Sequence, residues 1–148
     1  MPNTARLTLE TVEGEGLRFR ASTGSGQQAI TDSGPGKVAP SPTELLLVSL
    51  AGCMAMDVIA IMRKKRQQVS GYDIEVQGQR RADHPRAFTR IELVHRFTGS
   101  DLSREAAERS IELSVTKYCS VRASLDPAIV VTNRVELVPI ATPGHASA

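Results

Sequence analysis

The chain has 148 residues, of which 41% are hydrophobic and 23% charged, and this length suits one domain with a substantial core. Aromatic residues make up only 3% of the sequence, so we expect aliphatic side chains to fill that core. The net charge of +2, with acidic and basic residues mixed along the chain, is too weak a bias to indicate a nucleic-acid-binding surface.

The N-terminal residues 1–16 contain no apolar segment behind a basic start, so they are not expected to be a signal peptide. The sequence also has only two cysteines. Without an export signal, two thiols suit a reducing cytoplasm, where they are more often catalytic or idle than structural. We therefore expect a cytoplasmic protein.

The N-terminal part of the chain alternates with period two, which predicts three short strands at 6–12, 17–22 and 27–31. The glycine-containing segments GEG and GSG predict turns between them, and together these elements form a meander. A Gly/Pro-rich loop follows and ends in a helix start. Ser41 is expected to be the N-cap, Pro42 the first helical residue and Glu44 the acid of a capping box.

The predicted helix extends to about residue 67 and contains the apolar run 45–62, which could also be interpreted as a membrane span. Asp57 lies inside this run, and a charged residue costs about 2.5–3.5 kcal/mol at a bilayer centre on insertion scales. A helix that is apolar all round can also be the centre of a globular protein. We therefore expect a buried helix of a soluble protein and no membrane partner.

The second half of the sequence predicts two strands, a helix and a last strand. Residues 72–80 and 88–98 alternate and should pair as a hairpin. Residues 104–121 have apolar side chains four apart and should form a helix, and 129–138 should be a strand, followed by a frayed tail. Because this order lacks a βαβ rhythm, it predicts a single α+β domain over residues 1–148.

The two thiols, Cys53 and Cys119, lie on the apolar faces of the two predicted helices. Cys53 follows Gly52, and a glycine costs about 1 kcal/mol in a helix interior. Gly52 could leave room for another helix, a neighbouring chain or a substrate. Each cysteine could equally be a core residue, since buried cysteines are common. If the two sulfur atoms meet, one can attack an oxidant and the other can resolve the sulfenic acid as a disulfide.

Other chemistry receives little support from the sequence. The two cysteines and the three histidines, His84, His95 and His145, lie at no recognised metal-ligand spacing, so we expect no metal site. There is no phosphate loop and no dinucleotide fingerprint, so we expect no cofactor. The basic cluster at 63–66 has no interleaved aromatic residues, and we expect a solvated helix end rather than a contact with nucleic acid.

The segments SPTELLLVSLAGCMAMDVI and KYCSVRASL resemble the OsmC/Ohr family, osmotically inducible protein C and organic hydroperoxide resistance protein, and in particular its YhfA-like branch. The resemblance implies an OsmC-like α+β fold with two central helices packed between antiparallel β-sheets, in an intertwined homodimer. It also implies a thiol peroxidase of the oxidative stress response that reduces organic hydroperoxides. Cys53 matches the peroxidatic cysteine and Cys119 the resolving one, and a dithiol such as a dihydrolipoyl group is the implied reductant.

The family resemblance further implies an arginine that activates the thiolate and a glutamate that orients the arginine. Arg20 is the better positional match for the arginine, although exposed strand arginines usually serve solubility. The position of the glutamate is Thr43 here, and Glu44 lies nine residues before Cys53, half a turn out of phase on an ideal helix. Glu44 therefore suits the capping box better than catalysis. Two alternatives stay open: a non-catalytic protein that binds a small molecule or lipid, and a redox-sensing protein.

Overall fold

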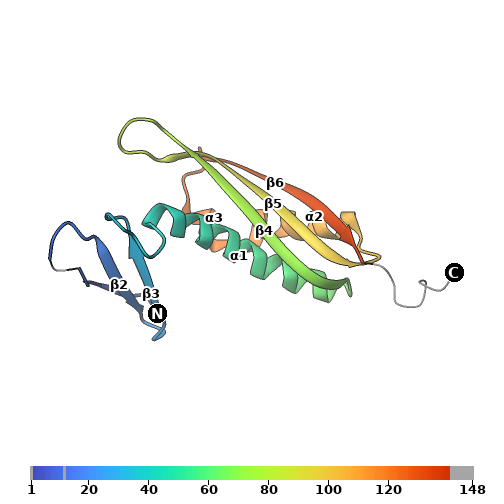
Figure 1. The fold of residues 1–148 in the computed structure, drawn as a ribbon. Helices are drawn as coiled ribbons and strands as arrows, with labels where there is room; N and C mark the ends of the chain where they lie inside the picture. The colour runs from blue at the N-terminus through green and yellow to red at the C-terminus, as the bar shows by residue number, and fades with distance from the viewer. Residues whose placement is uncertain (1, 12, 141–148) are drawn as a thin grey trace. The chain divides into compact units, whose positions relative to one another are not determined.

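The computed structural model describes residues 2–11 and 13–140 of the chain (Figure 1). These residues form two compact units, which divide between residues 46 and 47 within the long helix α1, Pro42–Lys64. We call them the N-terminal and C-terminal units. The expected frayed tail, with His145, lies outside the described residues, as does Val12 at the end of the first expected strand. The single domain expected over the whole chain stays a prediction.

The N-terminal unit contains a three-stranded antiparallel sheet in the order β1-β2-β3. Its strands are β1, Ala5–Leu9, β2, Arg18–Thr23, and β3, Gln28–Asp32. The expected meander is confirmed, with strand ends shifted by a few residues. Gly14 and Gly26 adopt φ values of 70° and 86° in the two turns, a left-handed conformation that favours glycine.

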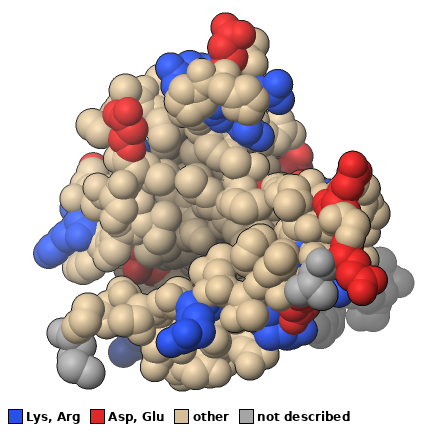
Figure 2. Space-filling model, turned by 90° about the vertical axis from the view of Figure 1, so that its left-hand side faces the viewer, with Lys and Arg blue, Asp and Glu red and all other residues tan. Residues whose placement is uncertain are grey.

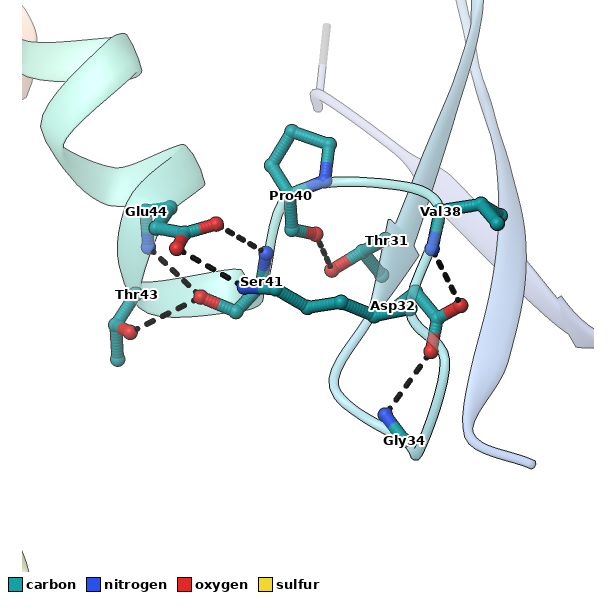
Figure 3. A network of polar contacts seen from close by, with 9 residues as sticks. Thr31, Asp32, Gly34, Val38, Pro40, Ser41, Thr43 and Glu44 are labelled. Carbon is teal, nitrogen blue, oxygen red and sulfur yellow. Dashed lines mark hydrogen bonds and ion pairs between the residues drawn. The ribbon is translucent and has the colours of Figure 1, made fainter. Parts of the chain in front are cut away.

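The loop between β3 and α1 is held by side chains from the end of β3 (Figure 3). The buried Asp32 carboxylate accepts hydrogen bonds from the backbone N–H of Gly34, at 3.0 Å, and of Val38, at 3.2 Å. Thr31 donates its hydroxyl to the carbonyl of Pro40 at 2.9 Å. A carboxylate that accepts two backbone N–H groups is a strong local anchor, so Asp32 determines the path of the chain into α1.

The C-terminal unit is built on a second three-stranded sheet in the order β4-β5-β6. The strands are β4, Gln68–Arg80, β5, Phe88–Ser100, and β6, Val130–Pro139. β4 and β5 form the expected antiparallel hairpin, but β6 runs parallel to β5. The expectation of antiparallel sheets is therefore wrong at this edge. Parallel strands need a long crossover, and the helical segment between β5 and β6 supplies it.

That helical segment is interrupted, although the sequence predicted one continuous helix over 104–121. It consists of α2, Arg104–Leu113, a π-helical turn η1, Ser114–Tyr118, and the short α3, Ser120–Ser124. Cys119 lies between η1 and α3 with an extended backbone, φ −74° and ψ 98°. The side-chain spacing of four residues could not reveal this break, because apolar residues four apart predict a continuous helix.

The core of the C-terminal unit lies between the sheet and the helices, which run along the sheet in Figure 1. Helix α1 contributes a stripe of buried residues four apart: Leu50, Met54, Val58 and Met62. Strand β5 contributes alternate residues: Ile91, Leu93, His95 and Phe97. Each such apolar side chain stabilises the fold by about 1.5–3 kcal/mol. The expectation of a mainly aliphatic core is confirmed, with Phe97 as its largest fully buried side chain.

Helix α1 buries one face rather than its whole circumference. Val48 and Met56 expose 59% and 73% of their surface. By length and composition, α1 could cross a membrane, and 22% of its most apolar window is buried in the structure. Central helices of globular proteins can have the same composition.

Charged side chains do not gather into one large patch on the face drawn in Figure 2, where acidic and basic groups lie among uncharged ones. This distribution matches the small net charge of the sequence.

Candidate functional site

The two cysteines of the chain come together in the C-terminal unit. The Sγ atoms of Cys53 and Cys119 and a carboxylate oxygen of Asp57 all lie within 4.8 Å of one another. We call these three residues the thiol cluster. Cys53 and Asp57 come from α1, whereas Cys119 comes from the junction of η1 and α3. The sequence placed both thiols on inward helix faces, and the structure shows that these faces meet.

Cys119 is positioned by the π-helical turn that precedes it. Its backbone N–H donates to the carbonyl of Ser114, five residues earlier, at 2.8 Å. Its Sγ atom in turn accepts a hydrogen bond from the backbone N–H of Arg122, at 3.3 Å. π-Helical turns within helical segments are frequent at functional sites, where they re-aim side chains. Here the turn ends the helix at the residue that carries the thiol.

Cys53 is half-buried on α1, directly after Gly52. A Cβ atom added to Gly52 would meet no heavy atom of the described residues within 4 Å. Among the described residues, therefore, no helix lies close enough to Gly52 to require a residue without a side chain. Of the three explanations that the sequence offered, a neighbouring chain and a substrate remain.

Asp57 is a member of the site that sequence reasoning missed. It lies four residues after Cys53, and this spacing places both side chains on the same face of a helix. Its Oδ2 atom accepts a hydrogen bond from Ser114 Oγ at 2.8 Å, and Ser114 is fully buried. In the sequence, Asp57 is a charged residue within an apolar run. Its distance from Cys53 along the helix was the available signal.

Burial dominates the electrostatics of Cys119, which is only 3% exposed. Burial raises the pKa of its thiol to about 11; the Arg122 N–H opposes this effect, whereas Cys53 and Asp57 add to it. The physical reason is that a thiolate loses its hydration in the protein interior and meets negative charge from its neighbours. At neutral pH, Cys119 is therefore a thiol.

Arg20 and Glu44, the two other predicted site residues, belong to the N-terminal unit. Arg20 lies on β2, where it forms an ion pair with Glu10 and donates to Gln28 at 3.4 Å. Arg18 Nε on the same strand lies 3.2 Å from the carboxylate of Glu10.

Glu44 and Ser41 form the predicted capping box (Figure 3). Glu44 accepts from the Ser41 N–H at 2.9 Å, and the Glu44 N–H donates to Ser41 Oγ at 3.3 Å. Lys37 Nζ lies 3.1 Å from the Glu44 carboxylate. The backbone N–H of Ser41, followed by Lys37, lowers the pKa of Glu44. The two hydrogen bonds with Ser41 are those of a helix cap, and the contact with Lys37 is an ion pair.

Comparison with known proteins gives a consistent assignment. A family model described as OsmC-like protein matches residues 34–134. Protein YhfA of Escherichia coli K12 is 41% identical over 124 residues, which cover 84% of this chain and 92% of YhfA. The crystal structure of a hypothetical protein from Aquifex aeolicus VF5 is 29% identical, with a TM-score of 0.81 over 95% of this chain and 99% of that one.

The fold is also shared with a more distant structure, the organic hydroperoxide resistance protein OhrB of Bacillus subtilis. The two are 17% identical, with a TM-score of 0.56 over 93% of this chain and 98% of OhrB. At this identity the likeness concerns the fold alone. With the family model matched over most of the chain and YhfA over most of its own length, the protein belongs to the OsmC-like family.

Proposed function

We propose that this protein is a cytoplasmic thiol-dependent reductase of organic hydroperoxides, with Cys53 as the peroxidatic and Cys119 as the resolving cysteine. The observation that carries the proposal is the approach of the two sulfur atoms, which come from segments far apart in the sequence, to within 4.8 Å. The fold shared with an organic hydroperoxide resistance protein adds support.

Burial supports this division of roles between the two thiols. Cys53 is half-buried and can meet a substrate, whereas Cys119 is almost completely buried. Only the thiolate is nucleophilic, and the raised pKa of Cys119 keeps that thiol protonated at neutral pH. Cys119 therefore suits the second step, in which it reacts with a sulfur atom already beside it.

The first step is attack of the Cys53 thiolate on the distal oxygen of the hydroperoxide. The O–O bond breaks, the alkoxide takes a proton and leaves as an alcohol, and Cys53 becomes a sulfenic acid. Cys119 then attacks the sulfur of Cys53. Its thiol proton passes to the adjacent Asp57 carboxylate and from there to the departing hydroxide, which leaves as water. The sulfur atoms must close to about 2.05 Å in the resulting disulfide.

The disulfide is returned to two thiols by a dithiol reductant, for which a dihydrolipoyl group is our candidate. Each turnover then transfers two electrons from the dithiol to the peroxide, and the dithiol becomes a disulfide. This exchange needs an accessible sulfur, and the half-buried Cys53 is the better target for the incoming thiolate.

The first step uses a thiolate as the nucleophile, and a nearby guanidinium favours that form of a cysteine. We propose Arg20 for this role, on its positional match to the family arginine. Glu44 stays a weaker candidate for orienting that arginine, since its carboxylate is engaged by the Ser41 N–H of the helix cap and by Lys37.

We also propose a homodimer, in which a second chain covers part of the apolar surface of the C-terminal unit. Val48 and Met56 on α1 and Tyr118 on η1 are among its large exposed side chains.

The experiment is a count of free thiols after stopped-flow mixing of the reduced protein with cumene hydroperoxide. The wild type should lose both thiols and gain one intramolecular disulfide. Cys119→Ser should accumulate a sulfenic acid that dimedone traps. Cys53→Ser should keep its one free thiol after mixing with the hydroperoxide. A wild-type protein that keeps both thiols, or a Cys119→Ser variant without sulfenate, would refute the peroxidase proposal.

One observation favours a second candidate, a non-catalytic protein that binds a small molecule or lipid. Among the described contacts of the two thiols, the neighbouring charged side chain is a carboxylate rather than a guanidinium. If the thiols survive hydroperoxide, mass spectrometry of ligand extracted from the purified protein tests this function. Mixed disulfides trapped by Cys119→Ser would instead indicate a redox-sensing protein.

A further inference from the structure

We propose that the reduced thiol cluster binds a thiophilic divalent cation, for which Zn²⁺ is the representative, through Cys53, Asp57 and Cys119. This inference is independent of peroxide reduction, because it concerns the resting dithiol. It also reverses our expectation from ligand spacing that the chain has no metal site. Spacing rules detect ligands that are close in the sequence, whereas here the third ligand, Cys119, comes from a segment far from Cys53 and Asp57 in the chain.

The geometry of the three ligand atoms is close to what zinc requires. Around a tetrahedral Zn²⁺, with bonds of 2.0–2.3 Å, neighbouring ligand atoms are about 3.5–3.8 Å apart. The two Sγ atoms and the Asp57 oxygen already lie within 4.8 Å of one another. The gap between these values is about 1 Å, which small side-chain rotations can close. The fourth position would be open to water or to an incoming ligand, as in catalytic zinc sites.

The groups behind the ligands are already in place. Ser114 is fully buried and donates to Asp57 Oδ2 at 2.8 Å, which orients the carboxylate. The Arg122 N–H donates to Cys119 Sγ at 3.3 Å, which orients the thiol and stabilises negative charge on it. Outer hydrogen bonds of this kind are a regular feature of metal sites, and they leave little to reorganise when the metal binds.

Charge and access also suit a cation. The thiol cluster contains three groups that are anionic when ionised. A divalent cation would offset the repulsion between the two thiolates and the carboxylate. Two thiolates and one carboxylate match the preference of zinc for sulfur with an occasional oxygen ligand. Cys53 and Asp57 are only half-buried, unlike Cys119. A hydrated ion can therefore reach the cluster from the Cys53 side.

The test is a titration of the reduced full-length protein with Zn²⁺ in competition with a chromophoric chelator. We expect one Zn²⁺ per chain and protection of both thiols from N-ethylmaleimide, counted by mass spectrometry. Replacing Zn²⁺ by Co²⁺ should give the near-ultraviolet charge-transfer band of cobalt bound to thiolate. That band should weaken in Cys53→Ser and in Cys119→Ser.

Asp57→Asn is the sharpest variant, because it keeps both thiols and removes only the carboxylate. We expect its affinity for Zn²⁺ to fall by about 10–100-fold, and that of Ser114→Ala by about 10-fold. His84→Gln and Glu112→Gln are matched controls, since both positions are exposed and lie outside the cluster; their affinity should equal that of the wild type.

Two results would overturn the inference: Asp57→Asn binding Zn²⁺ as tightly as the wild type, or Zn²⁺ binding that leaves both thiols open to alkylation. Should Asp57→Asn fail to fold, as judged by circular dichroism, the cobalt spectrum and thiol protection of the wild type still decide. No peroxide enters these measurements. A protein that binds zinc but leaves hydroperoxide unreduced would refute the proposed function alone, and the reverse result would refute the metal site alone.

Discussion

The hydrogen bond from Ser114 to Asp57 should be a measurable source of stability in the reduced protein. A hydrogen bond to a charged group contributes about 1.5–3 kcal/mol. Ser114 is fully buried but Asp57 is only half-buried, so we expect a coupling energy at the lower end, about 1.5 kcal/mol. Without the hydroxyl group of Ser114, the carboxylate loses this hydrogen bond, and water must take its place.

The coupling energy can be measured with a double-mutant cycle of Ser114→Ala, Asp57→Ala and the double variant. Urea denaturation of the reduced proteins at one protein concentration gives the four free energies of unfolding. Ser110→Ala is the matched control, since Ser110 is also fully buried on the same helical segment but donates to the backbone carbonyl of Ala106, at 2.7 Å. Paired with Asp57→Ala, it should be additive to within about 0.5 kcal/mol. If the coupling energy of Ser114 and Asp57 is as small as that of the control pair, the hydrogen bond does not contribute the predicted stability.

Three further predictions concern titration and the loop before α1. Burial, partly opposed by the hydrogen bond to Asn133, lowers the pKa of His95. Its contribution to stability should therefore be constant above about pH 6.5 and fall at lower pH, where the unfolded state takes up the proton first. Denaturation midpoints that are level from pH 7.5 to 5.5 would contradict this. Burial raises the pKa of Cys119 from 9.0 to about 11, so its contribution to stability should be present below pH 9 and disappear between pH 9 and 11. Cys119→Ser should lack this loss, and an identical pH profile in the variant would count against it. Asp32→Ala should destabilise the N-terminal unit by about 1–3 kcal/mol, because two backbone N–H groups lose their acceptor. Limited proteolysis within residues 33–40 should then be faster than in the wild type, and an unchanged cleavage rate would refute the anchoring role.

Much of the local structure could be predicted from the sequence. The three strands of the N-terminal meander, the β4–β5 hairpin and the capping box of Ser41 and Glu44 all depend on residues that are near one another in the chain. Periodicity and cap chemistry report such short-range preferences directly. The same patterns placed Cys53 and Cys119 on apolar helix faces, which was enough to suggest a pair of thiols.

Three features were decided only by tertiary structure. The parallel direction of β6 depends on its crossover, the end of the second helix at Cys119 depends on a π-helical turn, and the role of Asp57 depends on Ser114. In each case the deciding contact joins segments far apart in the sequence or changes a backbone hydrogen bond without changing the side-chain pattern. Apolar periodicity does not report such contacts, because it reflects which face of an element is buried and not which elements pair or how the backbone of one turn is bonded.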